Sequence, residues 1–260
     1  MGANGSVIEI KGLSKHYSTR TGANVVALDN VELSIADGEF ISVVGPSGCG
    51  KTTLLKIVAG LLPRTHGQVM LRGTPVDGPR KDIGIVFQHA VLMPWRTVLE
   101  NSMLPVEVQK LDKSKFRKRA QELLELVGLD GFEDKYPFEL SGGMQQRNSI
   151  VRALVTDPAL LLMDEPFGAL DAMTREQMNV ELLRIWDESK KTVVFITHSI
   201  PEAVFLADRV VVMTPRPGTI TAIYNVDLPR PRTLDLMGDA AFGSLVTRIR
   251  HHFDAEGALD

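Results

Sequence analysis

The residues from Gly45 to Thr52 have the spacing of a loop that binds phosphate groups. They match the pattern Gly-x-x-x-x-Gly-Lys-Ser/Thr. Without side chains in the way, the backbone N–H groups of such a loop can turn towards phosphate oxygens. We predict an ATP-Mg site here, because Lys51 would place a cation on the β and γ phosphates and the Thr52 hydroxyl would hold Mg²⁺. The predicted nucleotide-binding set is Gly45, Pro46, Ser47, Gly48, Cys49, Gly50, Lys51, Thr52 and Thr53. A tight glycine turn that binds nothing is the alternative.

Two adjacent carboxylates, Asp164 and Glu165, follow the apolar run at 160–163. If that run is a buried strand of an α/β sheet, its carboxyl end should lie beside the phosphate loop. Asp164 would then orient Mg²⁺, and Glu165 would accept a proton from the attacking water or polarise it. Paired acids also occur as helix caps or solvated loop charges. Their meaning therefore depends on the phosphate loop.

A second segment suited to anions contains Ser141, Gly142 and Gly143, just before an expected helix. The serine offers a hydroxyl, and the glycines leave the N–H groups of the helix start unobstructed for a phosphate. An ordinary capped helix would use the same residue types.

The elements that must position these residues belong to the α/β class, because short Val- and Ile-rich runs alternate with segments of helical period. A turn at Asp37 and Gly38 precedes the expected strand at 40–44, and a helix from about 51 to 59 should follow, with Gly60 as its cap. Strands are expected at 31–35, 40–44, 69–71, 83–86, 160–163, 193–197 and 210–213.

The middle of the chain has a helical texture. Thr97 with Glu100 is typical of a capping box, and Gly128 closes a helix with one apolar face. We predict a helical subdomain at about 89–155, inserted into a domain of residues 1–225. A short C-terminal appendage, 226–260, starts with Pro229, Pro231 and several arginines and ends in an amphipathic stretch. The apolar faces consist of Phe116, Ala120, Leu123, Leu124 and Val127, and of Phe242, Leu245, Val246, Ile249 and Phe253.

Bulk properties exclude several classes of protein. The 260 residues carry a formal net charge of −3, so a nucleic-acid partner is not expected. The apolar runs are far shorter than the roughly 18 residues that cross a bilayer, and no secretory signal is recognisable. The single cysteine, Cys49, excludes an internal disulfide and fits a reducing compartment. At a helix N-terminus its thiol should have a lowered pKa, with alkylation slowed by bound ATP; a small filler side chain is the alternative.

The octet Leu140-Ser141-Gly142-Gly143-Met144-Gln145-Gln146-Arg147 resembles the signature motif of the ABC (ATP-binding cassette) ATPases. The resemblance implies a P-loop NTPase (RecA-like) core with an antiparallel β subdomain and an inserted helical subdomain. It also implies a head-to-tail dimer, in which Ser141, Gly142 and Gly143 face the γ-phosphate bound by a second copy.

Further motifs of that family occur in the expected order. Gln88 resembles the glutamine that senses Mg²⁺ and the attacking water, and Leu170 with Asp171 resembles the loop joining two subunits. His198 is similar to the switch histidine that contacts the γ-phosphate, although a lone histidine after a strand is usually structural. Tyr17 resembles the aromatic on which adenine stacks, with core packing as the alternative.

The segments 92–98, 166–175 and 215–218 resemble in sequence the importer ATPases for nitrate, sulfonates and taurine. That subgroup implies a peripheral subunit on the cytoplasmic face of the inner membrane. Its partners would be integral-membrane permease subunits and, indirectly, an extracytoplasmic solute-binding protein. Residues 89–95 would lie near the groove for a permease coupling helix, although Trp95 could be a core residue. Asn148 and Ser149 replace small apolar residues that the family commonly carries, which leaves the helix packing there open.

Two alternatives share the catalytic motifs. A separate-chain ATPase of an ABC exporter is one, and a soluble ABC ATPase without a transport role is the other. The latter would usually carry duplicated cassettes or a long coiled-coil insertion, and the sequence has neither.

Overall fold

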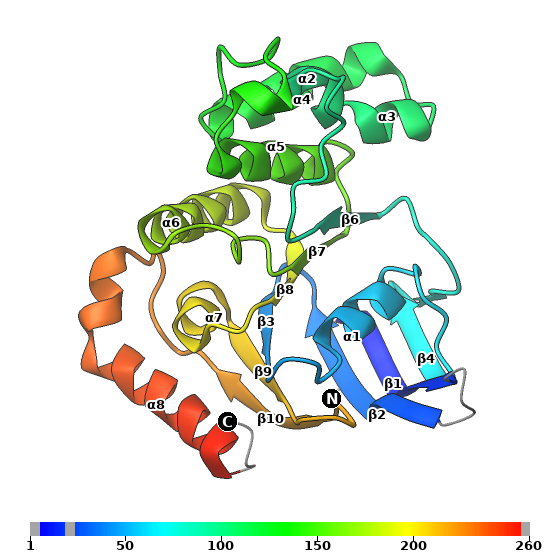
Figure 1. Ribbon diagram of the computed structural model, residues 1–260, viewed down its shortest axis with the longest axis vertical. Helices are drawn as coiled ribbons and strands as arrows, with labels where there is room; N and C mark the ends of the chain where they lie inside the picture. The colour runs from blue at the N-terminus through cyan, green and yellow to red at the C-terminus, as the bar shows by residue number, and fades with distance from the viewer. Residues whose placement is uncertain (1–5, 19–23, 256–260) are drawn as a thin grey trace. The chain divides into compact units, whose positions relative to one another are not determined.

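The computed structural model describes residues 6–18 and 24–255. The chain divides into two compact units (Figure 1). The first contains residues 1–80 and 191–260, and the second contains residues 81–190.

An antiparallel sheet forms one part of the first unit. Its strands are β1 (Ser6–Ser18), β2 (Asn24–Ala36), β4 (His66–Leu71) and β5 (Thr74–Pro75), in the order β2-β1-β4-β5. The strands expected at 31–35 and 69–71 lie within β2 and β4. The observed strands extend further than expected, because β1 pairs with both along their length. Sequence patterns missed β1. Gly12, at φ +58°, lies where its pairing register shifts, and this shift breaks the alternation that marks a strand.

A parallel group of strands forms the core of the first unit. The fully buried β3 (Phe40–Val44) pairs with β8 (Thr192–Ile196) and β9 (Arg209–Met213), and β10 (Ile220–Asn225) pairs antiparallel with β9. The expected strands at 40–44, 193–197 and 210–213 are confirmed to within a residue at each end. Helix α1 (Lys51–Val58) follows β3, and Gly60 lies just beyond its end at φ +71°.

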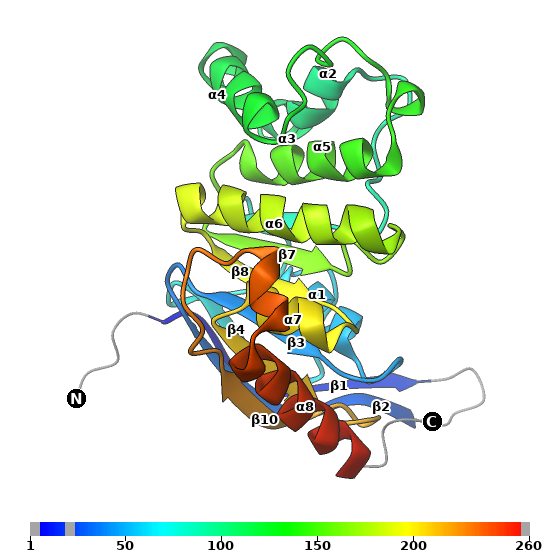
Figure 2. The same ribbon diagram turned by 90° about the vertical axis from the view of Figure 1, so that its left-hand side faces the viewer.

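The first unit closes with its C-terminal segment. After α7 (Ile200–Leu206) and β10 come η2 (Leu234–Gly238) and α8 (Ala240–Ala255). Helix α8 packs on α7 and runs beside β10 (Figure 2). The apolar face of α8 is buried, as the amphipathic pattern predicted, through Phe242, Leu245, Ile249 and Phe253, while Val246 is half-buried.

The second unit contains the parallel pair β6 (Ile83–Val86) and β7 (Leu160–Asp164), both as expected. Its helices are α2 (Val98–Ser102), α3 (Leu104–Val108), α4 (Lys113–Leu126), η1 (Pro137–Glu139), α5 (Gly142–Leu154) and α6 (Ala172–Ser189). Thr97 and Glu100 form the predicted capping box of α2. Gly128 follows α4 at φ +65°. In the part of the chain described, no helix is long and apolar enough to cross a membrane.

Candidate nucleotide-binding site

The phosphate loop is shaped by glycines that cannot carry a side chain. Gly50 has φ +110°, and a Cβ there would lie 2.7 Å from Leu28 Cδ2 and 2.9 Å from the Ala27 carbonyl oxygen. A Cβ on Gly45 would lie 2.8 Å from Cys49 Sγ. A larger residue at position 50 would therefore push the loop away from β2, and a larger residue at position 45 would collide with the Cys49 side chain of the loop itself. The loop keeps the bare backbone that close approach to a phosphate requires.

Lys51 directs its charge into this loop. The side chain is buried, and Nζ donates to the carbonyl oxygens of Gly45 at 2.7 Å and Pro46 at 3.1 Å. Helix α1 starts at Lys51 without a side-chain cap on its first turn. Its leading N–H groups and dipole therefore make the loop a favourable place for an anion. Thr52 and Ser47 are exposed beside it, and Thr53 is half-buried.

The expectation of a lowered pKa for the Cys49 thiol was wrong, and the alternative of a small filler side chain fits the structure. The thiol is 1 % exposed, and burial raises its pKa above the ordinary value, with the nearby Lys51 cation only partly opposing this. Helix-terminal position alone predicted a reactive thiolate, but removal of the sulfur from water favours its neutral form more strongly. Cys49 is thus a packed side chain, with its Sγ against the position where Gly45 would carry a Cβ.

Sequence reasoning missed a hairpin that backs the phosphate loop. Arg216 donates from Nη2 to the Gly48 carbonyl oxygen at 3.2 Å. Gly218 donates its N–H to the Ala27 carbonyl, and a Cβ on Gly218 would lie 1.9 Å from the Cys49 carbonyl oxygen. The sequence of residues 215–218 indicated only a resemblance to the importer subgroup, and no contact with the phosphate loop. Nothing in their spacing indicates that they meet a loop so distant in sequence.

His198 and Tyr17 belong to the same unit as the phosphate loop. Strands β3 and β8 are parallel neighbours, so His198, two residues after β8, follows the same sheet edge as the loop. Its side chain is exposed. Tyr17, near the end of β1, is 38 % exposed, with Lys15 Nζ 5.0 Å from the ring centroid. The core-packing alternative for Tyr17 is therefore wrong.

In the second unit, Asp164 ends β7 and Glu165 follows it. Glu165 has φ +47°, a backbone conformation that residues other than glycine rarely adopt. Its carbonyl accepts the Gly168 N–H at 3.0 Å, closing a tight turn. A Cβ on Gly168 would lie 3.2 Å from Gln88 Nε2, so the Gln88 side chain lies against this turn. The parallel strands β6 and β7 thus gather Gln88, Asp164 and Glu165 at one edge.

The signature residues lie at the start of α5, as expected. Ser141 Oγ accepts the Met144 N–H at 3.3 Å, and Gly142 remains exposed. A Cβ on Gly143 would lie 3.3 Å from Thr174 Cγ2, at the start of α6. Asp171 caps α6, and hydrogen bonds from the Thr174 hydroxyl and N–H hold the pKa of Asp171 below its ordinary value.

The predicted site residues therefore form two groups. The first unit holds the phosphate loop, Tyr17 and His198. The second unit holds Gln88, Asp164, Glu165 and the start of α5 with its serine and glycines.

Comparison with known proteins identifies the family. Residues 28–168 match the family model described as ABC transporter. This chain belongs to the ABC transporter family. An uncharacterized ABC transporter ATP-binding protein of Methanocaldococcus jannaschii is 53% identical over 86% of this chain and 84% of its own length.

Two further relatives of the ABC family have functional names. The taurine import ATP-binding protein TauB of Rhizobium johnstonii is 48% identical, with 86% of each chain covered. The aliphatic sulfonates import ATP-binding protein SsuB of Bacillus thuringiensis subsp. konkukian is 43% identical over 97% of this chain and 98% of its own.

Solved ABC structures share the fold. A dimeric ATP-binding cassette bound to ADP and Pi in a post-hydrolysis state has a TM-score of 0.74 and 34% identity, covering 85% of this chain and all of its own (100%). A member of a Clostridium perfringens ABC transporter complex has a TM-score of 0.76 and 26% identity, covering 96% and 99%. The chain has the P-loop NTPase fold of the ABC ATPases, and its enzymatic activity is ATP hydrolysis.

Proposed function

We propose that this chain is the ATP-hydrolysing subunit of an ABC importer for a small solute such as a sulfonate, taurine, nitrate or a related organic compound. The observation that carries the ATPase assignment is the buried Lys51 ammonium within the phosphate loop, 2.7 Å from the Gly45 carbonyl. The import direction rests on the likeness to TauB and SsuB. The solute itself would contact other subunits.

The residues present suit ATP with Mg²⁺. The glycine cradle and Lys51 would bind the phosphates. The Thr52 hydroxyl, the Gln88 amide oxygen and the Asp164 carboxylate are the oxygen donors that this hard cation prefers. Bound Mg²⁺ would neutralise charge on the phosphates. Glu165 would take the proton of the attacking water, and Tyr17 would stack on adenine.

A second copy of the chain would complete each site. The start of α5 offers the Ser141 hydroxyl and the N–H groups of Gly142 and Gly143 to a γ-phosphate held by the partner copy. His198 of the copy that binds this ATP would contact the same γ-phosphate, because it follows the same sheet edge as that copy's phosphate loop. This head-to-tail arrangement agrees with the dimeric state of the ADP-bound relative.

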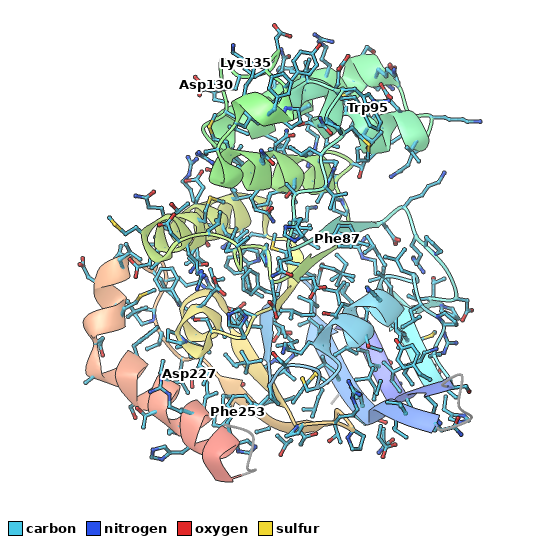
Figure 3. The ribbon with its side chains drawn as sticks, in the orientation of Figure 1. Phe87, Trp95, Asp130, Lys135, Asp227 and Phe253 are labelled. Carbon is cyan, nitrogen blue, oxygen red and sulfur yellow. The ribbon has the colours of Figure 1, made fainter. Side chains whose placement is uncertain are left out.

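The second unit also offers a surface for a permease. An apolar groove there is lined by residues that include Ile85, Phe87, Met93, Leu104, Pro105 and Val108. Arg152 fixes one wall, because it donates to the Ala90 and Val91 carbonyl oxygens at 2.7 Å. Trp95, labelled in Figure 3, is 71 % exposed and so is not a core residue. We assign this groove to a cytoplasmic segment of the permease, which would place the chain at the cytoplasmic face of the cell membrane.

We further propose a division of the chain into an ATPase domain and a short appendage. Residues 1–225 would form the ABC ATPase domain, with the helical subdomain at about 89–155 inserted. Residues 226–260 would form the C-terminal appendage. An extracytoplasmic solute-binding protein would act through the permease and would not contact this chain.

The function can be tested by purifying the tagged chain from native membranes in mild detergent and identifying its partners. We expect a multi-span permease and a solute-binding protein. Val108→Asp alters an exposed apolar residue that lines the groove and should reduce the recovered permease several-fold. Phe138→Asp alters a similarly exposed apolar residue that does not line the groove and should not reduce it. Recovery of only soluble partners, or of an exporter-type permease, would overturn the importer assignment while leaving the ATPase chemistry intact.

A further inference from the structure

Helix α7 begins two residues after His198 and is seven residues long. So short a helix has little stability of its own, and its position depends on what holds its two ends. At the N-terminal end, Ser199 Oγ accepts the Glu202 N–H at 3.4 Å, and the Thr197 hydroxyl donates to Glu202. Thr197 is in turn anchored by its N–H to the Val43 carbonyl of β3 at 3.2 Å.

The C-terminal end of α7 is held by an arginine from the appendage. Arg232 is buried, and its Nη1 donates to the carbonyl oxygens of Val204 at 3.2 Å, Phe205 at 2.9 Å and Ala207 at 2.8 Å. Helix α7 has no basic residue in its own last turn. The guanidinium therefore supplies both the hydrogen bonds and the positive charge that the end of a helix favours.

Arg230 connects the same end of α7 to the central strands, and we call Arg230 and Arg232 together the clasp. Its Nη2 donates to the Leu206 carbonyl oxygen and to Asp208 Oδ1, both at 2.8 Å. The other oxygen of the Asp208 carboxylate accepts the Phe40 N–H at 2.9 Å, at the start of β3. The two arginines thus fix the end of α7 against the strand that leads into the phosphate loop.

Helix α8 keeps the clasp in place. Its buried apolar face packs in the region of α7 and η2, and His252 lies 3.1 Å from the Thr221 hydroxyl of β10. The segment that carries both arginines runs between β10 and η2, so it is tethered at each end.

We propose that Arg232, supported by Arg230, is a positioning residue for His198, and that this gives the C-terminal appendage a role in ATP turnover. The inference rests on the proposed function, in which His198 contacts the γ-phosphate. Strand β8 is buried and hydrogen-bonded in its sheet, so it leaves His198 little freedom on that side. The remaining freedom lies in α7, and the clasp removes it.

The test compares ATP turnover of the full chain and of Arg232→Met, with Arg250→Met as a control for an exposed arginine on α8. Loss of the clasp should lower kcat about tenfold and change the KM for ATP less than about twofold, since the phosphate loop is untouched. Arg232→Lys keeps a cation at the helix end and should recover most of the loss. Arg250→Met should behave as the unaltered chain.

A double-mutant cycle with His198→Ala separates positioning from general destabilisation. His198→Ala should itself lower kcat by about 10²-fold, and adding Arg232→Met should then lower kcat by less than about twofold. Additive losses would overturn the inference. An unchanged kcat in His198→Ala would instead contradict the proposed role of His198. If Arg232→Met does not fold, the cycle uses Arg230→Gln, and additivity there overturns the inference equally.

Discussion

Asn148 on α5 donates from Nδ2 to Ser102 Oγ on α2 at 2.7 Å, and also to the Val98 carbonyl at 3.0 Å. The helix that begins with the signature residues is therefore fastened to its neighbour by a buried amide. Asn148 Oδ1 finds no hydrogen-bond partner among the described residues. The amide thus gains two bonds and leaves one acceptor unsatisfied.

Asn148→Val should change the free energy of unfolding by less than about 1 kcal/mol, because the unsatisfied oxygen is removed and Ser102 still donates to the Val98 carbonyl. Asn148→Asp should cost about 3 kcal/mol or more at neutral pH, since it buries a charge without a cation. Urea titration measures both variants. Similar losses for the two would contradict this account of the contact.

Glu165→Gln should leave ATP binding intact and lower turnover about 10²–10⁴-fold, the usual scale for a positioned base. The substitution keeps the size of the side chain, so the turn at φ +47° should survive. Steady-state hydrolysis and a binding titration together measure the effect. Near-normal turnover would refute the role of Glu165.

Gly50→Ala should weaken nucleotide binding roughly tenfold or more, because the added Cβ would collide with Leu28 and the Ala27 carbonyl. Gly73→Ala is the matched control. Gly73 also has a positive φ, +72°, but nothing lies within 4 Å of its Cβ position. It should lose about 1 kcal/mol of stability and no affinity. Titration calorimetry with ATP distinguishes the two, and equal loss of affinity would show that backbone strain alone matters.

Cys49 should be alkylated slowly at neutral pH both with and without ATP, since its thiol is buried and its pKa is raised. The raised pKa of the thiol also predicts how the stability of the fold depends on pH. The folded state retains the thiol proton at a pH where the unfolded state has lost it, so stability is full below the ordinary thiol pKa and falls as pH rises above it. Cys49→Ala should flatten that decline in a pH series of urea midpoints. Rapid labelling at pH 7 would contradict both statements.

Local patterns were sufficient wherever one short segment contains the whole signal. The strand at 40–44, the phosphate loop and the helix after it are contiguous, so spacing alone located Lys51 and Thr52 correctly. The capping box of Thr97 with Glu100 is equally local, because its two hydrogen bonds join residues three apart.

Features that depend on distant partners were not predictable in this way. The burial of Cys49, the packing of Arg216 on the phosphate loop and the partners of Asn148 all require knowledge of which segments meet. Strand β10 was missed for a related reason: it is mostly half-exposed, so its residues lack a clear apolar alternation. The Arg232 clasp was visible in sequence only as a basic, proline-containing stretch.

The hairpin between β9 and β10 has a practical consequence for anyone labelling this protein. Between residue 218 and the Cys49 carbonyl there is room for no atom beyond a glycine hydrogen, so the hairpin packs directly against the phosphate loop. A fluorophore, epitope or inserted peptide there would distort the nucleotide pocket from behind. The tip at Gly73 faces open space and is the better attachment point for a reporter.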